Sequence, residues 1–272
     1  MSYNVDTPEK DTEDWNKWRK DAVVDVMTEF GLKDFYGLQE TKNGGGPQIC
    51  EQIRDTINTR PAVQTAGKRY DFISIQNLPK NPGQDCENSI FFDSTQWKCL
   101  SSDGLWVWQD WDPRYAFYGI FQNIQQPQQT LIVFNTHAPA GNFKGSHNGF
   151  LPQDFVNIAN YITATRKKVS ADHPENVPVV FSGDWNGNVQ GQKDLQDIGL
   201  ETCRIKAGHQ GDIGPTWPST NPGDAFDQIL AGQSGIDWTD SSITVLGRGQ
   251  PNVEKASDHL PITAELHFLS LP

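Results

Sequence analysis

An acid and an amide lie two residues apart in the segment FSGDWNGN, directly after a run of strand-forming residues. Asp184 and Asn186 follow the run VPVVF at 177–181, and a β-strand gains nothing from either side chain at that place. Carboxylate and amide oxygens are, however, the ligands that a hard cation such as Mg²⁺ prefers. The segment therefore indicates a turn that binds a metal or a phosphate. The alternative is an Asx turn, in which Asp184 only bonds the backbone that follows it.

The same kinds of side chain recur where other predicted strands end. Carboxylates and amides suit Mg²⁺, and imidazoles with carboxylate partners suit proton transfer or the stabilisation of negative charge at phosphorus. A rigid sheet can aim the residues at its strand ends, so we expect these side chains to share one site. They are Asn4, Asp6, Glu40, His137, Asp184, Asn186, Asp227, Asp258 and His259.

Each of these residues also has an ordinary structural interpretation when it is taken alone. Glu40 is compatible with a solvated surface acid, and His137 with a hydrogen-bonded core histidine. Asp258 and His259 are compatible with the start of the last strand. The functional interpretation depends on the whole ordered set.

Helical and strand patterns along the chain define the elements that must hold these side chains. Apolar residues recur at helical spacing in 7–30, and Gly31 ends that helix. Further helices are predicted at 46–58, 151–169 and 192–200. Strands are predicted at 2–6, 34–40, 70–77, 88–93, 97–108, 115–124, 129–139, 177–185, 225–232, 240–247 and 260–268.

The order of these elements indicates an α/β fold. Two β-rich halves, each with its own helices, favour two sheets packed together between helical layers. The sequence contains no repeat, low-complexity tract or linker long enough to divide it, so we expect a single domain over 1–272.

Composition limits the possible partners. The 272 residues include 34 Asp and Glu against 22 Lys and Arg, a formal net charge of −12. This charge argues against broad, tight binding to nucleic acid and suits a site that concentrates divalent cations, while a local basic patch stays possible. Because no apolar run reaches about 18 residues, no membrane span is predicted.

The cysteines leave the redox state open. Cys50, Cys86, Cys99 and Cys203 form no CxxC pair, which argues against a zinc ribbon. An even number permits disulfides, such as Cys86 with Cys99 across a hairpin, and four thiols are equally compatible. The start in a strand without a visible leader, the acidity and the even cysteine count favour an exported protein, although the compartment is not determined.

Six segments resemble, in order and spacing, the motifs of the endonuclease/exonuclease/phosphatase superfamily, whose members are similar to pancreatic-type deoxyribonuclease. They are SYNVD, LQETK, NTHAP, SGDWNGN, AFDQIL and SDHLPI, and the similarity extends from Ser2 to Phe268. GDWNGN and SDHLPI are the most specific of them. The resemblance implies a four-layer α/β/β/α sandwich, with two mixed sheets packed face to face, helices outside and the active site at one rim.

The resemblance also implies a cation site. Glu40, within LQETK, matches the main Mg²⁺ ligand, and Mn²⁺ is an alternative ion. Asn4 and Asp258 match groups beside the metal, and Asp6 is a weaker candidate.

Roles in the reaction follow from the same resemblance. Asp184 matches the carboxylate that orients or deprotonates the attacking water, and Asn186 matches a donor to the scissile phosphate. His259 matches the histidine that contacts the phosphate or acts as a base, with Asp227 as its carboxylate partner.

A second histidine is expected on the leaving-group side. His137 matches it, with Glu87 from the central hairpin as its partner. The sequence departs from the pattern at Trp185, which replaces another aromatic residue, and at Phe226, which stands where a basic residue is usual.

Three basic residues are candidate substrate contacts. Lys42 lies in LQETK, Lys144 lies in the polar loop 138–150, and Arg114 follows a tryptophan-rich segment. A solvated connection is the ordinary interpretation of this loop, and a loop that contacts the substrate is the alternative. Trp106, Trp108 and Trp111, near Arg114, could stack on nucleobases, but alternating tryptophans also occur on one packed face of a strand.

The substrate is not fixed by the fold. The first hypothesis is a nuclease that uses Mg²⁺ or Mn²⁺ to cleave DNA or RNA phosphodiesters. The second is a phosphatase or phosphodiesterase that acts on a small phosphorylated molecule or a lipid headgroup, which the acidic composition favours. The third is a catalytically silent binding module on the same scaffold, against which the intact set of polar residues argues.

We expect a monomer without a membrane span.

Overall fold

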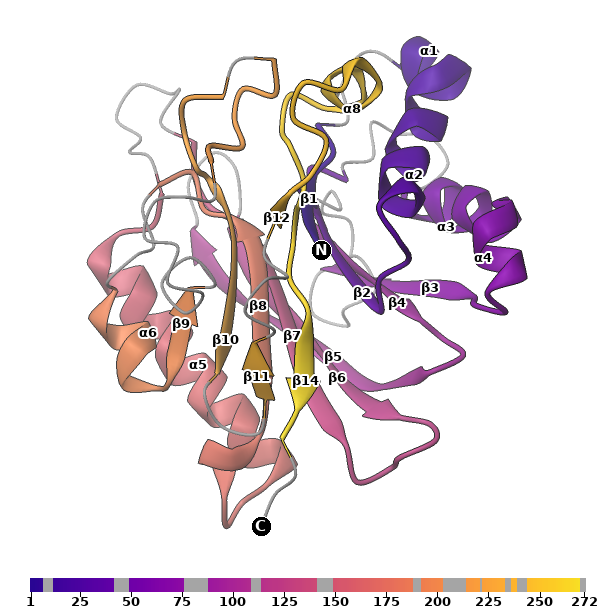
Figure 1. Cartoon of the computed structure of the whole chain (residues 1–272). Helices are drawn as coiled ribbons and strands as arrows, with labels where there is room; N and C mark the ends of the chain where they lie inside the picture. The colour runs from indigo at the N-terminus through magenta and orange to yellow at the C-terminus, as the bar shows by residue number, and fades with distance from the viewer. Residues whose placement is uncertain are drawn as a thin grey trace.

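The computed structural model of the protein describes residues 1–6, 12–41, 49–75, 88–108, 114–140, 149–187, 192–202, 214–220, 222–232, 236–238 and 244–269. Two six-stranded mixed sheets form the centre of the molecule (Figure 1). The first has the order β12 (Thr244–Val245), β13 (Ile262–Thr263), β1 (Ser2–Asn4), β2 (Phe35–Gln39), β4 (Asn88–Asp93) and β3 (Tyr70–Ser74). The second has the order β5 (Trp97–Trp108), β6 (Arg114–Asn123), β7 (Thr130–His137), β8 (Val179–Asp184), β10 (Asp227–Gly232) and β9 (Leu200–Thr202).

Helices cover the outer face of each sheet (Figure 1). α1 (Thr12–Asp14), a π-helical segment (Trp15–Arg19), α2 (Lys20–Glu29), α3 (Ile49–Thr59), α4 (Pro61–Thr65) and α8 (Pro251–Ala256) lie on the side of the first sheet. α5 (Pro152–Val169) and α6 (Lys193–Asp197) cover the second sheet, where a 3-10 turn at Pro174–Asn176 follows α5. The expected α/β/β/α sandwich is therefore confirmed.

Apolar side chains fill all three interfaces between the layers. The apolar stripe of α2 packs Val23 and Met27 against Tyr36 of β2 in one core cluster. On the other side, Phe155 of α5 belongs to a cluster with the residues of β7 and β8, and a third cluster that includes Phe117 lies between the sheets. Burial of these clusters from water is the main force that holds the strand ends in place.

One detail differs from the expectations. The last strand, expected at 260–268, is divided: β13 pairs with β1 and β12, whereas β14 (Leu266–Phe268) pairs with β11 (Ile236–Trp238). Cys50 and Cys99 are free thiols in the structure. Cys86, the suggested partner of Cys99, and Cys203 lie outside the described residues. No helix in the described part of the chain is long and apolar enough to cross a membrane.

A buried amide joins the two sheets beneath one rim. Asn135 of β7 donates through Nδ2 to the carbonyl oxygens of Leu38 at 2.8 Å and Ser89 at 2.9 Å. Its Oδ1 accepts a hydrogen bond from Gln39 Nε2 at 2.7 Å. Asn135 lies two residues before His137, so these bonds fix the end of β7 relative to the first sheet.

Asn135→Ala is expected to lower the free energy of unfolding by about 2 kcal/mol or more, because it leaves buried polar groups of the first sheet without this partner. Urea unfolding measures the change. Asn160→Ala, on the exposed face of α5, is the matched control and should change stability by less than about 0.5 kcal/mol. Equal stability of the two variants would contradict the structural role of Asn135.

Candidate active site

The strand-end residues meet at one rim because of how the strands pair. β1 and β2 run parallel and place Asn4 beside Gln39, the residue before Glu40. β7 and β8 also run parallel and place His137 beside Asp184. β10 runs antiparallel to β8, and its first residue, Asp227, pairs with Asp184 from the other side.

Three of these residues have a backbone conformation that L-amino acids rarely adopt. Asp6, Glu40 and Asn186 have φ values of 40°, 56° and 44°. Glu40 directly follows β2, and Asp6 and Asn186 come two residues after the last residues of β1 and β8. Such left-handed residues cost free energy and are concentrated at functional sites. They turn the chain sharply where the sheets end and aim the side chains at the rim.

Asp184 lies at the centre of the group and uses its two oxygens differently. Oδ1 accepts a hydrogen bond from the backbone nitrogen of Asn186 at 2.9 Å, which is the Asx turn considered from the sequence. Oδ2 accepts from Asn4 Nδ2 at 3.0 Å and lies 3.7 Å from His137 Nε2 and 3.6 Å from His259 Nε2. One carboxylate thus shapes the turn and also faces both histidines.

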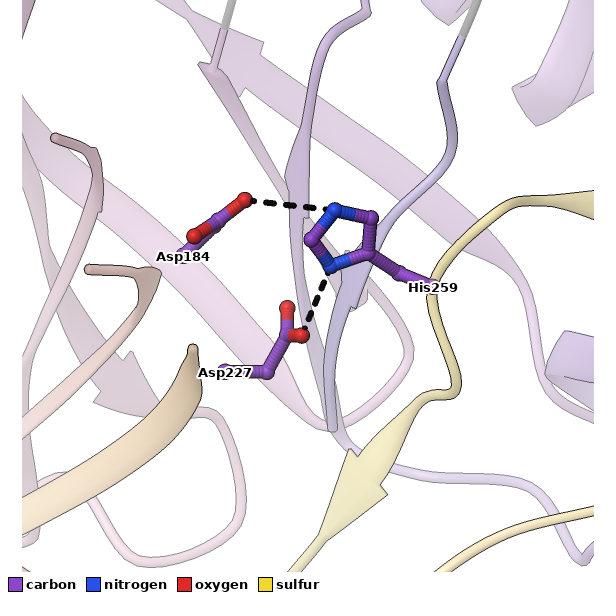
Figure 2. A group of neighbouring side chains, drawn as sticks. All are labelled: Asp184, Asp227 and His259. Atoms are coloured by element: carbon purple, nitrogen blue, oxygen red, sulfur yellow. Dashed lines mark hydrogen bonds and ion pairs between the residues drawn. The ribbon is translucent and has the colours of Figure 1, made fainter. Parts of the chain in front are cut away.

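His259 is held between two carboxylates (Figure 2). Its Nδ1 lies 2.8 Å from Asp227 Oδ2, and both residues are buried. Burial alone would lower the pKa of His259, but the negative charges of Asp227 and Asp184 outweigh it and raise the pKa to about 10. These charges therefore favour the protonated ring. Burial raises the pKa of Asp184, and the charge of His259 opposes that rise.

Glu40 is a strained acid at the edge of this group. Its Oε1 accepts from Asn4 Nδ2 at 2.9 Å and lies 3.8 Å from His137 Nε2. Burial raises the pKa of Glu40 to about 7, the hydrogen bond from Asn4 opposes the rise, and the carboxylates of Asp6 and Asp184 add to it. Carboxylate oxygens gathered in one place suit a divalent cation.

The donor atoms fit a divalent cation on the side of Glu40. The described residues contain one group whose possible ligand atoms lie within 4.8 Å of one another, formed by Asp184, Asp227 and His259. In that group, however, His259 Nδ1 and Asp227 Oδ2 already contact each other at 2.8 Å. Glu40, whose side chain is 29% exposed, and Asp258, at 49%, are the accessible oxygen donors.

Some of the remaining predicted residues lie at the site, some contact other groups of the protein, and three lie outside the described residues. Asp258 Oδ1 lies 3.9 Å from His259 Nε2, which places it at the same site. Asp6 is paired with Arg19 Nη2 at 2.7 Å, so its charge is already balanced in part. Asn186 donates from Nδ2 to the carbonyl oxygen of Ala138 at 2.9 Å. Glu87, Lys42 and Lys144 lie outside the described residues.

Arg114 and Trp106, which the sequence suggested as substrate contacts, both pack against neighbouring side chains of the protein. Arg114 is only 5% exposed, and its Nη1 lies 2.6 Å from His137 Nδ1. Trp106 is 38% exposed and its ring packs against Tyr115 at 5.3 Å, and the side chain of Trp108 and the residue Trp111 lie outside the described part of the chain.

Solved structures similar to this chain were found by their fold. An endonuclease/exonuclease/phosphatase from Bacteroides vulgatus has a TM-score of 0.66 at 17% identity, over 98% of this chain and 97% of that chain. A mannosyl-6-phosphatase from Bacteroides thetaiotaomicron has a TM-score of 0.65 at 18% identity, over 98% of both chains. TDP2 of D. rerio, complexed with a single-stranded DNA product, has a TM-score of 0.65 at 18% identity, over 98% and 97%.

This chain has the endonuclease/exonuclease/phosphatase fold. No family model matches its sequence, and no curated protein does either.

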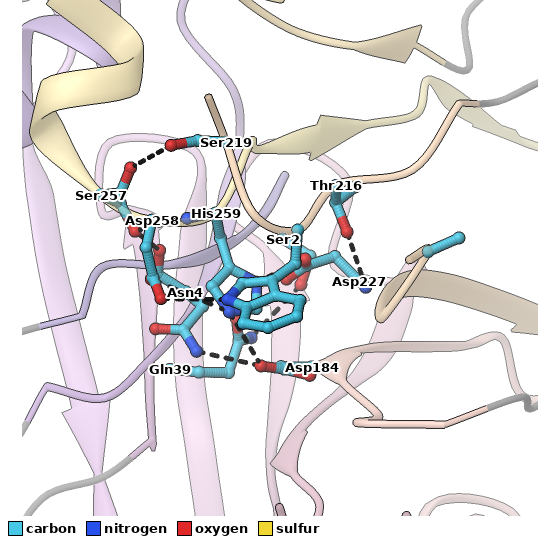
Figure 3. Close-up of polar contacts among 12 residues, drawn as sticks. Ser2, Asn4, Gln39, Asp184, Thr216, Ser219, Asp227, Ser257, Asp258 and His259 are labelled. Atoms are coloured by element: carbon cyan, nitrogen blue, oxygen red, sulfur yellow. Dashed lines mark hydrogen bonds and ion pairs between the residues drawn. The ribbon is translucent and has the colours of Figure 1, made fainter. Parts of the chain in front are cut away.

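Sequence reasoning missed two groups that support the site of this endonuclease/exonuclease/phosphatase fold. Trp217 donates from Nε1 to Asp258 Oδ2 at 3.0 Å. Ser257, labelled in Figure 3, donates from Oγ to the carbonyl oxygen of Asn4 at 2.7 Å and accepts from the backbone nitrogen of His259 at 3.1 Å. Ser257 begins the segment SDHLPI and was therefore visible as part of a motif, whereas Trp217 lies 41 residues from Asp258 and carried no signal.

Asp227→Asn is expected to lower the pKa of His259 well below 10, because it removes the largest favourable charge at Nδ1. Titration of the ring by NMR measures the shift. Because the pKa of His259 is raised from its ordinary value of 6.5, its protonation stabilises the fold fully below pH 6.5, and this stabilisation is lost as the pH rises through about 10. Asp227→Asn should therefore lower the free energy of unfolding more at pH 6 than above pH 10. An unchanged pKa of His259 would contradict the assigned pair.

Proposed function

We propose that the protein is a divalent-cation-dependent hydrolase of phosphate esters, and that its substrate is a nucleic-acid phosphodiester. The observation that carries this proposal is the convergence of Asn4, His137 and His259 on a single oxygen of Asp184, with Glu40 beside them. Each comes from a different strand end or turn, and a sheet needs none of them for its own stability.

The charges of these residues suit attack on an anionic ester. The His259 imidazolium, held by Asp227, supplies fixed positive charge where negative charge develops on the phosphoryl oxygens. Asp184 has a pKa raised by burial, which makes its carboxylate a stronger base for the proton of an attacking water. Asn4 keeps Asp184 and Glu40 in their relative positions by donating to both.

Glu40, Asn4 and Asp258 are the residues that would hold a Mg²⁺ or Mn²⁺ ion. When bound, such an ion acts as a Lewis acid on a phosphoryl oxygen and on the departing oxygen. The strained backbone and the raised pKa of Glu40 support this assignment, because both are costs that a bound cation offsets.

Aromatic side chains at the rim support a nucleic-acid substrate. Trp217 and Phe226 stack with ring centroids 5.6 Å apart, and both are only half-buried. The hydrogen bond from Trp217 to Asp258 places this pair beside the candidate site. Half-exposed aromatic rings next to a phosphate site suit stacking on a base or a sugar.

A small phosphorylated molecule is the second candidate substrate. The net charge of −12 favours it, because a long polyanion would be repelled by most of the surface. The similar mannosyl-6-phosphatase supports the same alternative, since it shares this fold.

One set of assays separates these possibilities. Supercoiled plasmid, p-nitrophenyl phosphate and bis-p-nitrophenyl phosphate are each incubated with the protein in Mg²⁺, Mn²⁺ or EDTA. Plasmid nicking that EDTA abolishes supports a nuclease. Turnover of the small esters alone would replace the nuclease assignment by the second candidate, and no turnover of any ester would contradict the proposed hydrolase.

Asp184→Ala and His259→Ala are each expected to lower kcat by on the order of 100-fold or more on whichever ester is turned over, because each removes a positioned proton acceptor or a fixed charge. The exposed pair Asp172→Ala and His173→Ala are the matched controls and should retain the wild-type kcat. A near-normal kcat in the Asp184 or His259 variant would remove that residue from the mechanism.

Glu40→Gln is expected to stabilise the protein in cation-free buffer at about pH 8. The folded-state pKa of about 7 exceeds the ordinary value of 4.5, so the contribution of Glu40 to stability is present below pH 4.5 and is lost as the pH rises through about 7. The gain should be on the order of 1 kcal/mol, less than the full shift because 29% of the side chain is exposed.

Added Mg²⁺ should then raise the Tm of the wild type and not that of Glu40→Gln. Glu51→Gln, an exposed change on α3, is the matched control and should behave as the wild type. A Mg²⁺-induced rise in Tm that is equal in the wild type and Glu40→Gln would place the cation elsewhere.

A further inference from the structure

The two histidines of the site have opposite partners at the ring nitrogen that faces away from Asp184. His259 Nδ1 faces the carboxylate of Asp227 at 2.8 Å. His137 Nδ1 faces the guanidinium of Arg114 at 2.6 Å. The Nε2 atoms of the two rings both point toward Asp184 Oδ2, at 3.6 Å and 3.7 Å. One oxygen thus lies between two imidazoles with different electrostatic surroundings.

The contact with Arg114 determines where the proton of His137 resides. A guanidinium has only N–H donors and stays charged in proteins, so at this distance His137 Nδ1 must be the acceptor. An imidazole that accepts at Nδ1 is neutral and carries its single hydrogen on Nε2. The Nε2–H group of His137 is then directed into the space next to Glu40 Oε1, at 3.8 Å, and Asp184 Oδ2.

We propose that Arg114 is a positioning residue that holds His137 as a neutral hydrogen-bond donor to the phosphoryl or leaving oxygen of the substrate. This inference rests on the proposed function, and it deepens the role of the second histidine. His259 supplies positive charge, whereas His137 supplies an uncharged N–H group of fixed direction. His137 consequently transfers no proton in the reaction.

The strand register explains why Arg114 can hold this position. β6 and β7 are antiparallel with Ala116 opposite Thr136, so the start of β6 and the end of β7 lie side by side at this rim. Arg114 and His137 are 5% and 3% exposed, and few other conformations are open to two buried side chains in contact. A second imidazolium next to a guanidinium would be repelled strongly in such a place, because water screens buried charges poorly.

The tautomer is tested directly by ¹⁵N NMR on protein labelled at histidine nitrogens, with His137→Gln used to assign the signal. At about pH 7 the wild type should show an unprotonated Nδ1 and a protonated Nε2 for His137. Arg114→Met, which keeps the length but not the donors, should shift the ring to the other tautomer or to a mixture, whereas Arg54→Met on α3 should leave the spectrum unchanged. A wild-type His137 that is protonated at Nδ1 would overturn the proposal.

A pair of substitutions at His137 tests its role as a donor. The amide N–H of Gln approximates the place of the histidine Nε2–H, so His137→Gln should keep kcat within about tenfold of the wild type, while His137→Ala loses on the order of 100-fold. Equal losses in both variants would overturn the donor role. Because the NMR measurement needs no turnover, failure of the proposed function, seen as an inactive wild type, is distinguishable from failure of this inference.

Discussion

The structure of the site depends on one buried carboxylate oxygen. Asp184 Oδ2 accepts a hydrogen bond from Asn4 on the first sheet and faces His137 and His259, which reach it from other parts of the rim. A buried carboxylate is costly unless donors and positive charge surround it. The group of side chains around Asp184 is therefore mutually dependent, and removal of one member leaves another without its partner.

The sandwich supplies that arrangement through its two sheets. β1 belongs to one sheet and β8 to the other, so the bond from Asn4 to Asp184 spans the interface between them. Below it, Asn135 ties β7 to β2 and β4. The apolar clusters set the distance between the layers, and these polar bonds set the relative register at the rim. The relative position of the two sheets at the rim must be accurate, because hydrogen bonds weaken steeply when donor and acceptor are misaligned.

Much of this could be predicted from the sequence, because the chemistry follows strands of clear β pattern. Asp184 and Asn186 come directly after an apolar run, and the structure has a turn there in which Asp184 contacts both backbone and side chains. The long helix expected at 151–169 is α5, and the layers of the sandwich agree with the resemblance. Local pattern and motif order were sufficient at these places.

The remaining features depend on register and on contacts between distant residues. Arg114 meets His137 only because β6 and β7 lie side by side with a particular offset, and nothing in the 22 intervening positions specifies it. Trp217 contacts Asp258, although the two residues are 41 positions apart in the sequence. The last strand divides between two sheets, which its continuous β pattern does not reveal. Single-sequence patterns carry little information on such pairings.

Anomalous diffraction from crystals soaked in Mn²⁺ tests the central claim, that the rim side chains converge around one cation and one phosphoester. The account predicts a single strong Mn²⁺ peak bonded to a carboxylate oxygen of Glu40, at about 2 Å, on the side of Asn4 and Asp258. A peak coordinated by Asp227 and His259 without Glu40, or crystals with no peak at the rim, would contradict it.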